Sequence, residues 1–295
     1  MSLRPLRALS LLACSLPLFA AAQTTLEKVK QSGLMGVAYR ESSIPFSYLD
    51  DKAQPVGFGA DICNKVVEEV KKATGRADLK VQLQAVTSAN RIPLLQNGTI
   101  DIECGSTTNN SERGKQVAFA TNYFYTGTRF LVKAGTSVKT IADLAGKTVV
   151  STTGTTNFKI IRNLNEEKKL GIELVGAKDH AESALMVQTG RALAFGMDDI
   201  LLYGLKASAA NPAELAVVGE PIQVEPYAIM VRRDDPAFKK LVDDTLAALI
   251  KSGEFEALYK KWFLSPIPPK GINLQAPMSQ ELRDNLKALS DKPAT

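Results

Sequence analysis

Apolar and polar positions follow one another along the chain in patterns that predict strands alternating with helices. Apolar residues three and four apart predict a helix over 58–72 that ends near Gly75, and strict alternation predicts a strand over 81–86. Strands that alternate with helices of this length favour an α/β fold with a parallel sheet. The other predicted elements are strands over 36–40, 99–103, 128–133, 147–151, 172–174, 192–197 and 227–231, and helices over 90–95, 157–170 and 181–189.

The last part of the chain has a different pattern. Pro236, after two aspartates, begins a helix with one apolar face that ends at Gly253, and a second short helix is predicted over 255–262. Prolines then interrupt regular structure, and 280–289 is predicted to form a last helix.

The first 22 residues have the pattern of a secretory signal. Arg4 and Arg7 precede a mostly apolar run over 8–19, and the alanines at 20–22 provide a cleavage site. We therefore expect cleavage after Ala22. No later window approaches 18 apolar residues in a row, so we expect the mature chain to be soluble.

The cysteines leave two questions open. Residues 11–14 also resemble a lipoprotein cleavage box that leaves Cys14 acylated, although the segment before Cys14 is unusually short for one. If the signal is instead cleaved after residue 22, Cys63 and Cys104 remain, and an oxidising compartment allows them to pair without requiring it.

Composition and charge narrow the function classes. The 295 residues, 45% of them hydrophobic, are enough for two domains with their own cores. Without Arg4 and Arg7 the chain has 34 basic against 31 acidic side chains, a net charge of +3, and the scattered basic residues argue against nucleic-acid binding. A single histidine, His180, excludes metal sites built on paired histidines. Phosphate-loop, dinucleotide and nucleophile-elbow motifs are absent, so we expect neither a cofactor nor enzyme chemistry.

Polar residues follow the carboxyl ends of six predicted strands, which is where open α/β sheets bind ligands. An α-amino acid has a carboxylate that pairs with a bidentate cation and an ammonium that pairs with a carboxylate, and burying either alone is costly. Arg113 and Asp198 are candidates for these two roles, although Arg113 also fits a surface loop and Asp198 a helix N-cap. The candidate binding residues are Arg40, Ser88, Arg91, Ser106, Thr108, Arg113, Thr155, Thr156, His180 and Asp198.

Five motifs together resemble a known family. They are RESSIPFSY from Arg40, TSANRIPLLQNGT from Thr87, ECGSTTNN from Glu103, AKDH from Ala177 and KWF from Lys261. From residue 26 to 269 the chain resembles solute-binding proteins of ATP-driven amino-acid importers, and within them the periplasmic glutamate/aspartate-binding branch. One departure is that Gly59 stands where the wider family commonly has an acidic residue.

The resemblance implies a two-lobed α/β fold, the type II periplasmic-binding-protein fold, with a mostly parallel sheet flanked by helices in each lobe. Residues 1–22 are then the signal peptide and 280–295 a C-terminal helix and tail. The first lobe comprises 23–127 with 226–279, and the second 128–225. Two crossing strands, expected at 126–128 and 224–226, join the lobes around a cleft that closes on the ligand.

The resemblance also assigns roles to the candidate residues. It implies that Arg113, with Thr108 and Thr156, holds the α-carboxylate of the ligand. Asp198 and the backbone carbonyl of Ser106 then take the ammonium.

Arg40, Ser88, Arg91 and His180 remain for the side chain of the ligand. Two guanidiniums and an imidazole favour a second carboxylate, because unneutralised charge in a closed cleft is expensive. Two alternatives stay open: Arg91 on a helix face, bridging to Glu112, and His180 as a satisfied loop histidine. Phe46, Tyr48 and Phe58 fit either a cleft wall or the core.

We therefore expect a monomeric periplasmic protein that captures L-glutamate or L-aspartate and delivers it to an inner-membrane ABC permease. The alternatives are a binding protein for glutamine or asparagine and a cleft enzyme of the dehydratase type. An extracellular receptor sensor of this architecture requires a transmembrane segment after the second lobe, and the sequence has none there.

Overall fold

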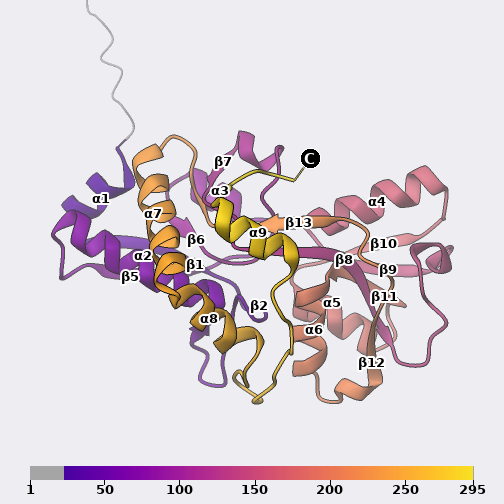
Figure 1. Ribbon diagram of the computed structural model, residues 1–295. Helices are drawn as coiled ribbons and strands as arrows, with labels where there is room; N and C mark the ends of the chain where they lie inside the picture. Colours follow the sequence, from indigo (N-terminus) through magenta and orange to yellow (C-terminus); the bar gives the residue numbers. More distant parts are fainter. Residues whose placement is uncertain (1–22, 295) are drawn as a thin grey trace, which may run out of the picture.

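Two mixed β-sheets, each with its own helices, organise the chain (Figure 1). The computed structural model describes residues 23–294, so the expected signal peptide at 1–22 and Cys14 lie outside the described residues. Within the described part, no helix is both long and apolar enough to cross a membrane. We call the five-stranded sheet with its helices the first lobe, and the six-stranded sheet with its helices the second lobe.

The sheet of the first lobe has the strand order β5-β1-β6-β14-β7. β5, β1 and β6 are parallel, and β14 and β7 extend the sheet in antiparallel pairing. Its elements are β1 (Leu34–Tyr39), β5 (Lys80–Ala85), β6 (Ile102–Glu103), β7 (Val117–Phe119) and β14 (Met230–Arg232), with helices α1 (Thr25–Ser32), α2 (Phe58–Thr74), α3 (Arg91–Gln96), α7 (Pro236–Ser252) and α8 (Glu254–Phe263).

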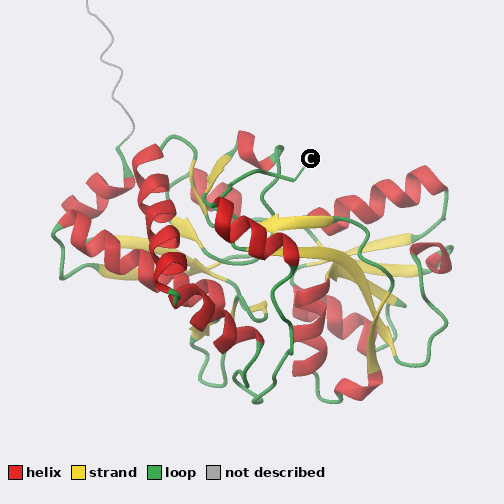
Figure 2. Ribbon diagram, viewed as in Figure 1, coloured by secondary structure: helices red, strands yellow, loops and turns green. Residues whose placement is uncertain are grey.

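The sheet of the second lobe has the order β10-β9-β11-β8-β12, with β13 paired to β8. Figure 2 shows α4 above these strands and α5 and α6 below them. The elements are β8 (Phe124–Lys133), β9 (Thr148–Thr152), β10 (Glu173–Ala177), β11 (Ala194–Asp198), β12 (Leu215–Val218) and β13 (Val224–Tyr227), with helices α4 (Thr156–Lys168), α5 (His180–Gln188) and α6 (Asp199–Ser208). Three 3-10 turns lie at Arg113–Lys115, Ile141–Leu144 and Pro212–Glu214.

The expected α/β architecture, with a mostly parallel sheet in each lobe, is confirmed. Three strands in each sheet are joined by parallel pairing, and one strand, β14 in the first sheet and β8 in the second, runs against all the others. β7 precedes β8, the strand that crosses to the second lobe, and β14 follows β13, the strand that returns to the first lobe. The chain therefore enters and leaves each sheet through strands of opposite direction.

One long strand belongs to both lobes. The ring of Phe124, at the start of β8, stacks on Phe263 of α8 in the first lobe, with 5.1 Å between the ring centroids. Further along β8, Leu131 lies opposite Phe195 of β11 in the second lobe. β13 runs antiparallel to the first part of β8, with Glu225 opposite Thr126.

A disulfide joins Cys63 of α2 to Cys104, directly after β6, and so answers the question that the sequence leaves open. It ties the helix to the beginning of the loop that holds Ser106 and Thr108. The same contact explains Gly59, because a Cβ built there would overlap the carbonyl oxygen of Cys104. An acidic side chain at position 59 does not fit this packing.

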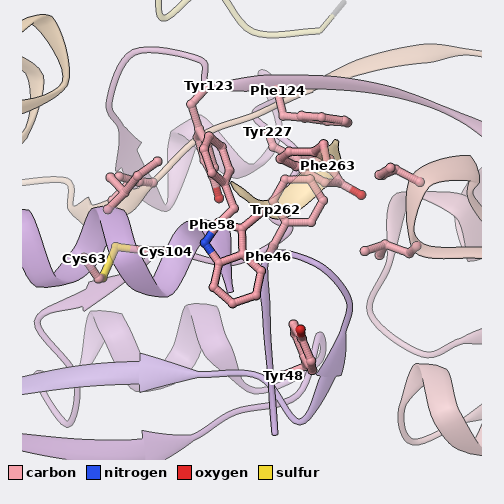
Figure 3. Close-up of a cluster of buried hydrophobic side chains, with 14 of the residues drawn as sticks. Phe46, Tyr48, Phe58, Cys63, Cys104, Tyr123, Phe124, Tyr227, Trp262 and Phe263 are labelled. Atoms are coloured by element: carbon pink, nitrogen blue, oxygen red, sulfur yellow. A yellow bond between two sulfur atoms is a disulfide. The ribbon is translucent and has the colours of Figure 1, made fainter. Parts of the chain in front are cut away.

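The aromatic residues 46, 48 and 58 lie in the core, which decides between the two interpretations of them (Figure 3). The loop around Phe46 includes a small sheet of β2 (Ser42–Ser43), β3 (Ser47–Leu49) and β4 (Pro55–Val56). Phe46 has ring neighbours from both crossing strands and from α2 and α8, at centroid distances of 4.9–6.3 Å: Phe58, Tyr123, Phe124, Tyr227 and Phe263.

The predicted C-terminal helix is present as α9 (Gln280–Ala288). Leu282 is buried, and the Nδ2 atom of Asn285 donates to the carbonyl oxygen of Asn122, 2.7 Å away. This helix therefore packs beside the start of β8, as Figure 1 shows.

Candidate ligand-binding site

The candidate residues of the second lobe lie at the beginnings of helices that follow parallel strands. Thr156 is the first residue of α4, and His180 is the first residue of α5. Local caps set these positions, since the hydroxyl of Thr155 accepts from the backbone N–H of Phe158 at 3.1 Å and the carboxylate of Asp179 caps α5. Asp198 ends β11 immediately before α6.

The candidate residues of the first lobe follow its three parallel strands. Arg40 comes directly after β1, and Arg91 begins α3 after β5. The loop after β6 contains Ser106 and Thr108 and leads to Arg113 at the start of a 3-10 turn. All three arginines are buried.

A glycine turn brings the lobes close together here. Gly154 has φ of +82°, and a Cβ built on it would lie 2.6 Å from Cα of Ala89 in the first lobe. A side chain at this position is therefore excluded by both the backbone conformation and the neighbour. The carbonyl oxygen of Gly154 accepts from Nη2 of Arg113 at 3.0 Å, and Nη1 of the same residue donates to the carbonyl of Thr108. Arg113 is thus held between the lobes and does not lie on a surface loop.

Arg40 contacts His180 across the same boundary. Nη2 of Arg40 donates to the Ser88 hydroxyl at 2.9 Å and lies 3.1 Å from Nε2 of His180. Because a guanidinium can only donate, Nε2 accepts and the imidazole proton is on Nδ1. Nδ1 then donates to the Thr152 hydroxyl at 2.8 Å, which donates in turn to Ser183.

His180 is therefore neutral, which corrects the expected charge of the site. Burial, and then the neighbouring guanidiniums of Arg40 and Arg91, lower the pKa of His180 well below its usual range. The interpretation as a satisfied histidine fits these two hydrogen bonds, although the residue begins a helix. Its imidazole does not add to the positive charge available to a ligand.

Arg91 points into the same region and not toward Glu112. Its Nη1 donates to the carbonyl oxygen of Ser106 at 3.2 Å, whereas Glu112 pairs with Lys159 of α4. The alternative of a helix-face Arg91 bridging to Glu112 is therefore wrong. The side chain of Ser106 donates to Ser43, which leaves its carbonyl directed at the arginine.

Arg40 and Arg91 each have one buried donor without a partner in the described part of the protein. Within residues 23–294, Nη1 of Arg40 and Nε of Arg91 have no hydrogen-bond partner. Burial lowers the pKa of Arg40 to about 9, which still leaves it charged at neutral pH. Buried donors of this kind are uncommon unless a ligand or water satisfies them.

A buried carboxylate near these arginines escaped the sequence analysis. Glu103 of β6 is 1% exposed, and its Oε2 accepts from the Thr107 hydroxyl at 2.5 Å. Its charge opposes the effect of burial on the pKa of both Arg40 and Arg91. Glu103 reduces the net charge around Arg40 and Arg91 from +2 to +1.

Asp198 has two protein partners at the other end of the site. It accepts from Nδ2 of Asn157 at 2.9 Å and from the hydroxyl of Tyr227. It occupies the N-cap position of α6 without capping it through its side chain, so a simple capping role is excluded. Burial, with the nearby charge of Glu225, raises the pKa of Asp198 to about 7.

Thr108 and Thr156 meet at a second carboxylate that the sequence analysis did not assign. Their hydroxyl oxygens are 3.3 Å apart, and both hydroxyls donate to Oε2 of Glu225, at 3.1 and 2.6 Å. A charged residue inside a predicted crossing strand was the available signal for Glu225. Thr155 is farther from this chemistry, because its hydroxyl caps α4 and donates to the carbonyl of Thr152.

The donor set does not suggest a metal site. Among the described residues, no three His, Cys, Asp or Glu side chains are grouped to hold a metal ion. The cluster is instead made of guanidiniums, hydroxyls and single carboxylates, which recognise charged organic groups.

Comparison with known proteins identifies the family. Residues 35–265 match the model of the bacterial extracellular solute-binding proteins, family 3. The chain belongs to that family. This assigns it to a family of binding proteins and not of enzymes.

Curated relatives in the family cover nearly the whole chain. The chain is 50% identical over 272 residues to the glutamate/aspartate import solute-binding protein of Salmonella typhimurium, covering 92% of this chain and 90% of the relative. It is 49% identical over 271 residues to the L-glutamate/L-aspartate-binding protein of Pseudomonas aeruginosa, with 92% and 90% coverage.

Solved structures share the fold. ArgBP from T. maritima, in a mutant form, superposes with a TM-score of 0.72 and 27% identity over 80% of this chain and 98% of that one. The cysteine-binding protein from Campylobacter jejuni, 22% identical with a TM-score of 0.71, covers 81% of this chain and 93% of that one and shows the fold alone. The two-lobed architecture of type II periplasmic binding proteins, predicted from the sequence, is thus confirmed.

Proposed function

We propose that this protein captures L-glutamate or L-aspartate between its lobes and delivers it to an inner-membrane ABC permease. The relatives that are about half identical over nine-tenths of the chain are named for these two ligands. The proposal also rests on chemistry within the site.

The observation that carries the proposal is the pair of distal arginines. Arg40 and Arg91 are each 2% exposed, and neither forms an ion pair with a carboxylate in the part of the chain that the structure describes. Together with Glu103 they leave one positive charge, which a ligand carboxylate neutralises. A neutral amide leaves it in place, at a cost in a buried site.

The remaining residues fit the two charged groups that every amino acid carries. In this proposal Arg113, Thr108 and Thr156 hold the α-carboxylate. Asp198 and the carbonyl of Ser106 accept from the ammonium.

Ser88 and His180 act with the distal arginines. Nε2 of His180 and the Ser88 hydroxyl both accept from Arg40 and hold its guanidinium in place. Thr155 caps α4 and thereby places the residue that follows it.

The proposal extends to the location of the protein in the cell, the boundaries of its lobes and its oligomeric state. The signal pattern at 1–22 supports a periplasmic location, with cleavage after Ala22. We propose lobe boundaries at 23–127 with 226–279 and at 128–225, with 280–295 as an added helix and tail, and a protein that acts as a monomer. The antiparallel pairing of Thr126 with Glu225 supports these boundaries.

A thermal-shift panel of the twenty amino acids tests the ligand class. A ligand at 100 times its dissociation constant stabilises the folded protein by about 2.7 kcal/mol. At roughly 2–4 °C per kcal/mol for a chain of this size, the melting temperature rises by about 5–10 °C. We expect this rise with glutamate and aspartate, and a smaller one with glutamine and asparagine.

The same panel separates the alternatives. A full shift with glutamine and none with glutamate favours an amide-binding protein, and no shift with either acid contradicts the proposal. NMR of the incubated ligand then distinguishes binding from catalysis, because a binding protein returns the ligand unchanged.

A further inference from the structure

Glu225 bridges the two lobes through the hydroxyls proposed to hold the α-carboxylate of the ligand. Thr108 belongs to the loop after β6 in the first lobe, and Thr156 begins α4 in the second. Both donate to a single oxygen of Glu225, on the crossing strand β13, and this side chain is 3% exposed. The relatives' names do not assign a role to this residue.

Counting hydroxyl protons shows a conflict. Each threonine hydroxyl has one hydrogen to donate. When both hydrogens are directed at Glu225, neither hydroxyl can donate to a ligand carboxylate. Binding an α-carboxylate at Thr108 and Thr156 therefore requires them to turn away from Glu225.

Like charges give the same conflict. Asp198 and Glu225 are both buried, and the charge of Glu225 helps to raise the pKa of Asp198. An α-carboxylate at Thr108 and Thr156 brings a further negative charge beside the same oxygen of Glu225. Burial also raises the pKa of Glu225, although both hydroxyls and Arg113 oppose that shift.

We infer that Glu225 is an internal latch, whose carboxylate holds Thr108 and Thr156 together in the ligand-free protein and is displaced when an amino acid binds. This inference rests on the proposed function, since it needs a ligand that carries an α-carboxylate. The latch stabilises contact between the lobes and competes with the ligand for the same two donors.

The first test is calorimetric titration of glutamate into wild type and Glu225→Gln. The amide keeps the size of the side chain but is a weaker acceptor and carries no charge. We expect the variant to bind glutamate about tenfold more tightly, because the weaker acceptor releases the two hydroxyls to the ligand more readily. Glu220→Gln, at an exposed position before β13, is the matched control and leaves the affinity unchanged.

The second test uses solution scattering of the ligand-free protein. Without the bridge, the lobes separate more often, so we expect a larger radius of gyration for Glu225→Gln than for wild type. Thr156→Val, which removes the donor from the second lobe, gives the same expansion by a different substitution. Far-ultraviolet circular dichroism checks that each variant is folded.

Each contrary result has a definite meaning. Weaker glutamate binding by Glu225→Gln makes the residue a ligand contact and overturns the latch. If Glu225→Gln binds glutamate more tightly but the ligand-free protein does not expand, the loss of like-charge repulsion alone explains the gain. That result also overturns the latch. If wild type binds no acidic amino acid, the proposed function fails, whereas the ligand-free scattering still tests the bridge.

Discussion

Arg40 and Arg113 are both buried arginines of the same site, yet they face different groups. Arg113 is held by two backbone carbonyls beside Thr108 and Thr156, whereas Arg40 contacts Ser88 and His180. Their positions after β1 and β6 were predictable from the strand pattern. The carbonyls that hold Arg113 were not predictable, because backbone atoms carry no residue signature, and the direct contact of Arg40 with His180 depends on how the lobes meet.

This difference gives a selectivity prediction. Arg113→Met removes the proposed partner of the α-carboxylate, which all amino acids carry, so the binding of glutamate and of glutamine should weaken by similar amounts. Arg40→Met removes a cation assigned to the distal carboxylate, so glutamate should lose ~2–5 kcal/mol of binding free energy and glutamine much less. Calorimetric titration of both ligands makes the comparison. Equal losses for both ligands in Arg40→Met place that arginine at the wrong end of the ligand.

Asp198 gives a prediction on pH. Its pKa is raised from 3.8 to about 7, so the folded ligand-free protein binds this proton more tightly than the unfolded chain. The contribution of Asp198 to the free energy of unfolding should therefore be full below about pH 4 and be lost as the pH rises toward 7. The total change is on the order of 4 kcal/mol, because one pKa unit corresponds to about 1.4 kcal/mol.

Asp198→Asn isolates this contribution from those of other titrating groups. Denaturant unfolding of both proteins from pH 4 to 8 gives the difference in unfolding free energy, wild type minus variant, which should fall with rising pH. A difference that does not change with pH would show that Asp198 titrates near its ordinary pKa.

At the scale of elements, apolar periodicity located helices with one buried face. α2 and α7 were predicted because their buried residues recur at helical spacing, and Gly75 and Gly253 end them in left-handed conformation. α6 was missed since residues 200–205 are almost all buried and show no polar face. Gly204 also interrupts the apolar run of this helix. A glycine is needed there, because a Cβ at position 204 would lie 2.6 Å from the carbonyl oxygen of Ile44.

The strand predicted over 227–231 is two strands in the structure. After β13 the chain leaves its pairing with β8, and the N–H of Ala228 donates to the carbonyl of Thr107 before β14 begins. A continuous apolar run does not reveal that its two ends pair with different strands. The switch is set by tertiary contacts.

The disulfide gives a prediction at the same scale. It closes a loop of sequence separation 41 between α2 and the end of β6. The chain-entropy model gives about 4 kcal/mol for a loop of this length. We expect Cys63→Ala with Cys104→Ala to lower the free energy of unfolding by about 2–4 kcal/mol in denaturant titration, and wild type in reductant to match it. An unchanged midpoint would show that packing around Gly59 holds this contact without the bond.

At the scale of the molecule, the site exists only where the lobes meet. Arg40 faces His180, Thr108 faces Thr156, and Arg113 reaches the carbonyl of Gly154, all across the boundary. Sequence periodicity predicted most of the longer strands, and the resemblance predicted their division between two lobes, but periodicity did not predict which residues of one sheet oppose those of the other. The family motifs supplied that information, and the paired crossing strands show how the chain achieves it.

This arrangement predicts compaction on ligand binding. A ligand held by Arg113 in the first lobe and Asp198 in the second interacts fully only when both lobes are close, so it favours the closed state over the open one. The radius of gyration from solution scattering should therefore decrease when glutamate is added to the ligand-free protein.

Two comparisons make that measurement decisive. Alanine, which has the α-groups but no distal carboxylate, leaves Arg40 and Arg91 unsatisfied and should compact the protein only at much higher concentration. Glu225→Gln, which begins more open if the latch is present, should show a larger decrease with glutamate and reach the same final radius as wild type. Calorimetry on the same sample establishes that wild type is saturated with glutamate. No decrease in the radius of gyration at saturation would contradict capture by lobe closure. A ligand that interacts equally with the open and the closed states cannot shift the equilibrium between them.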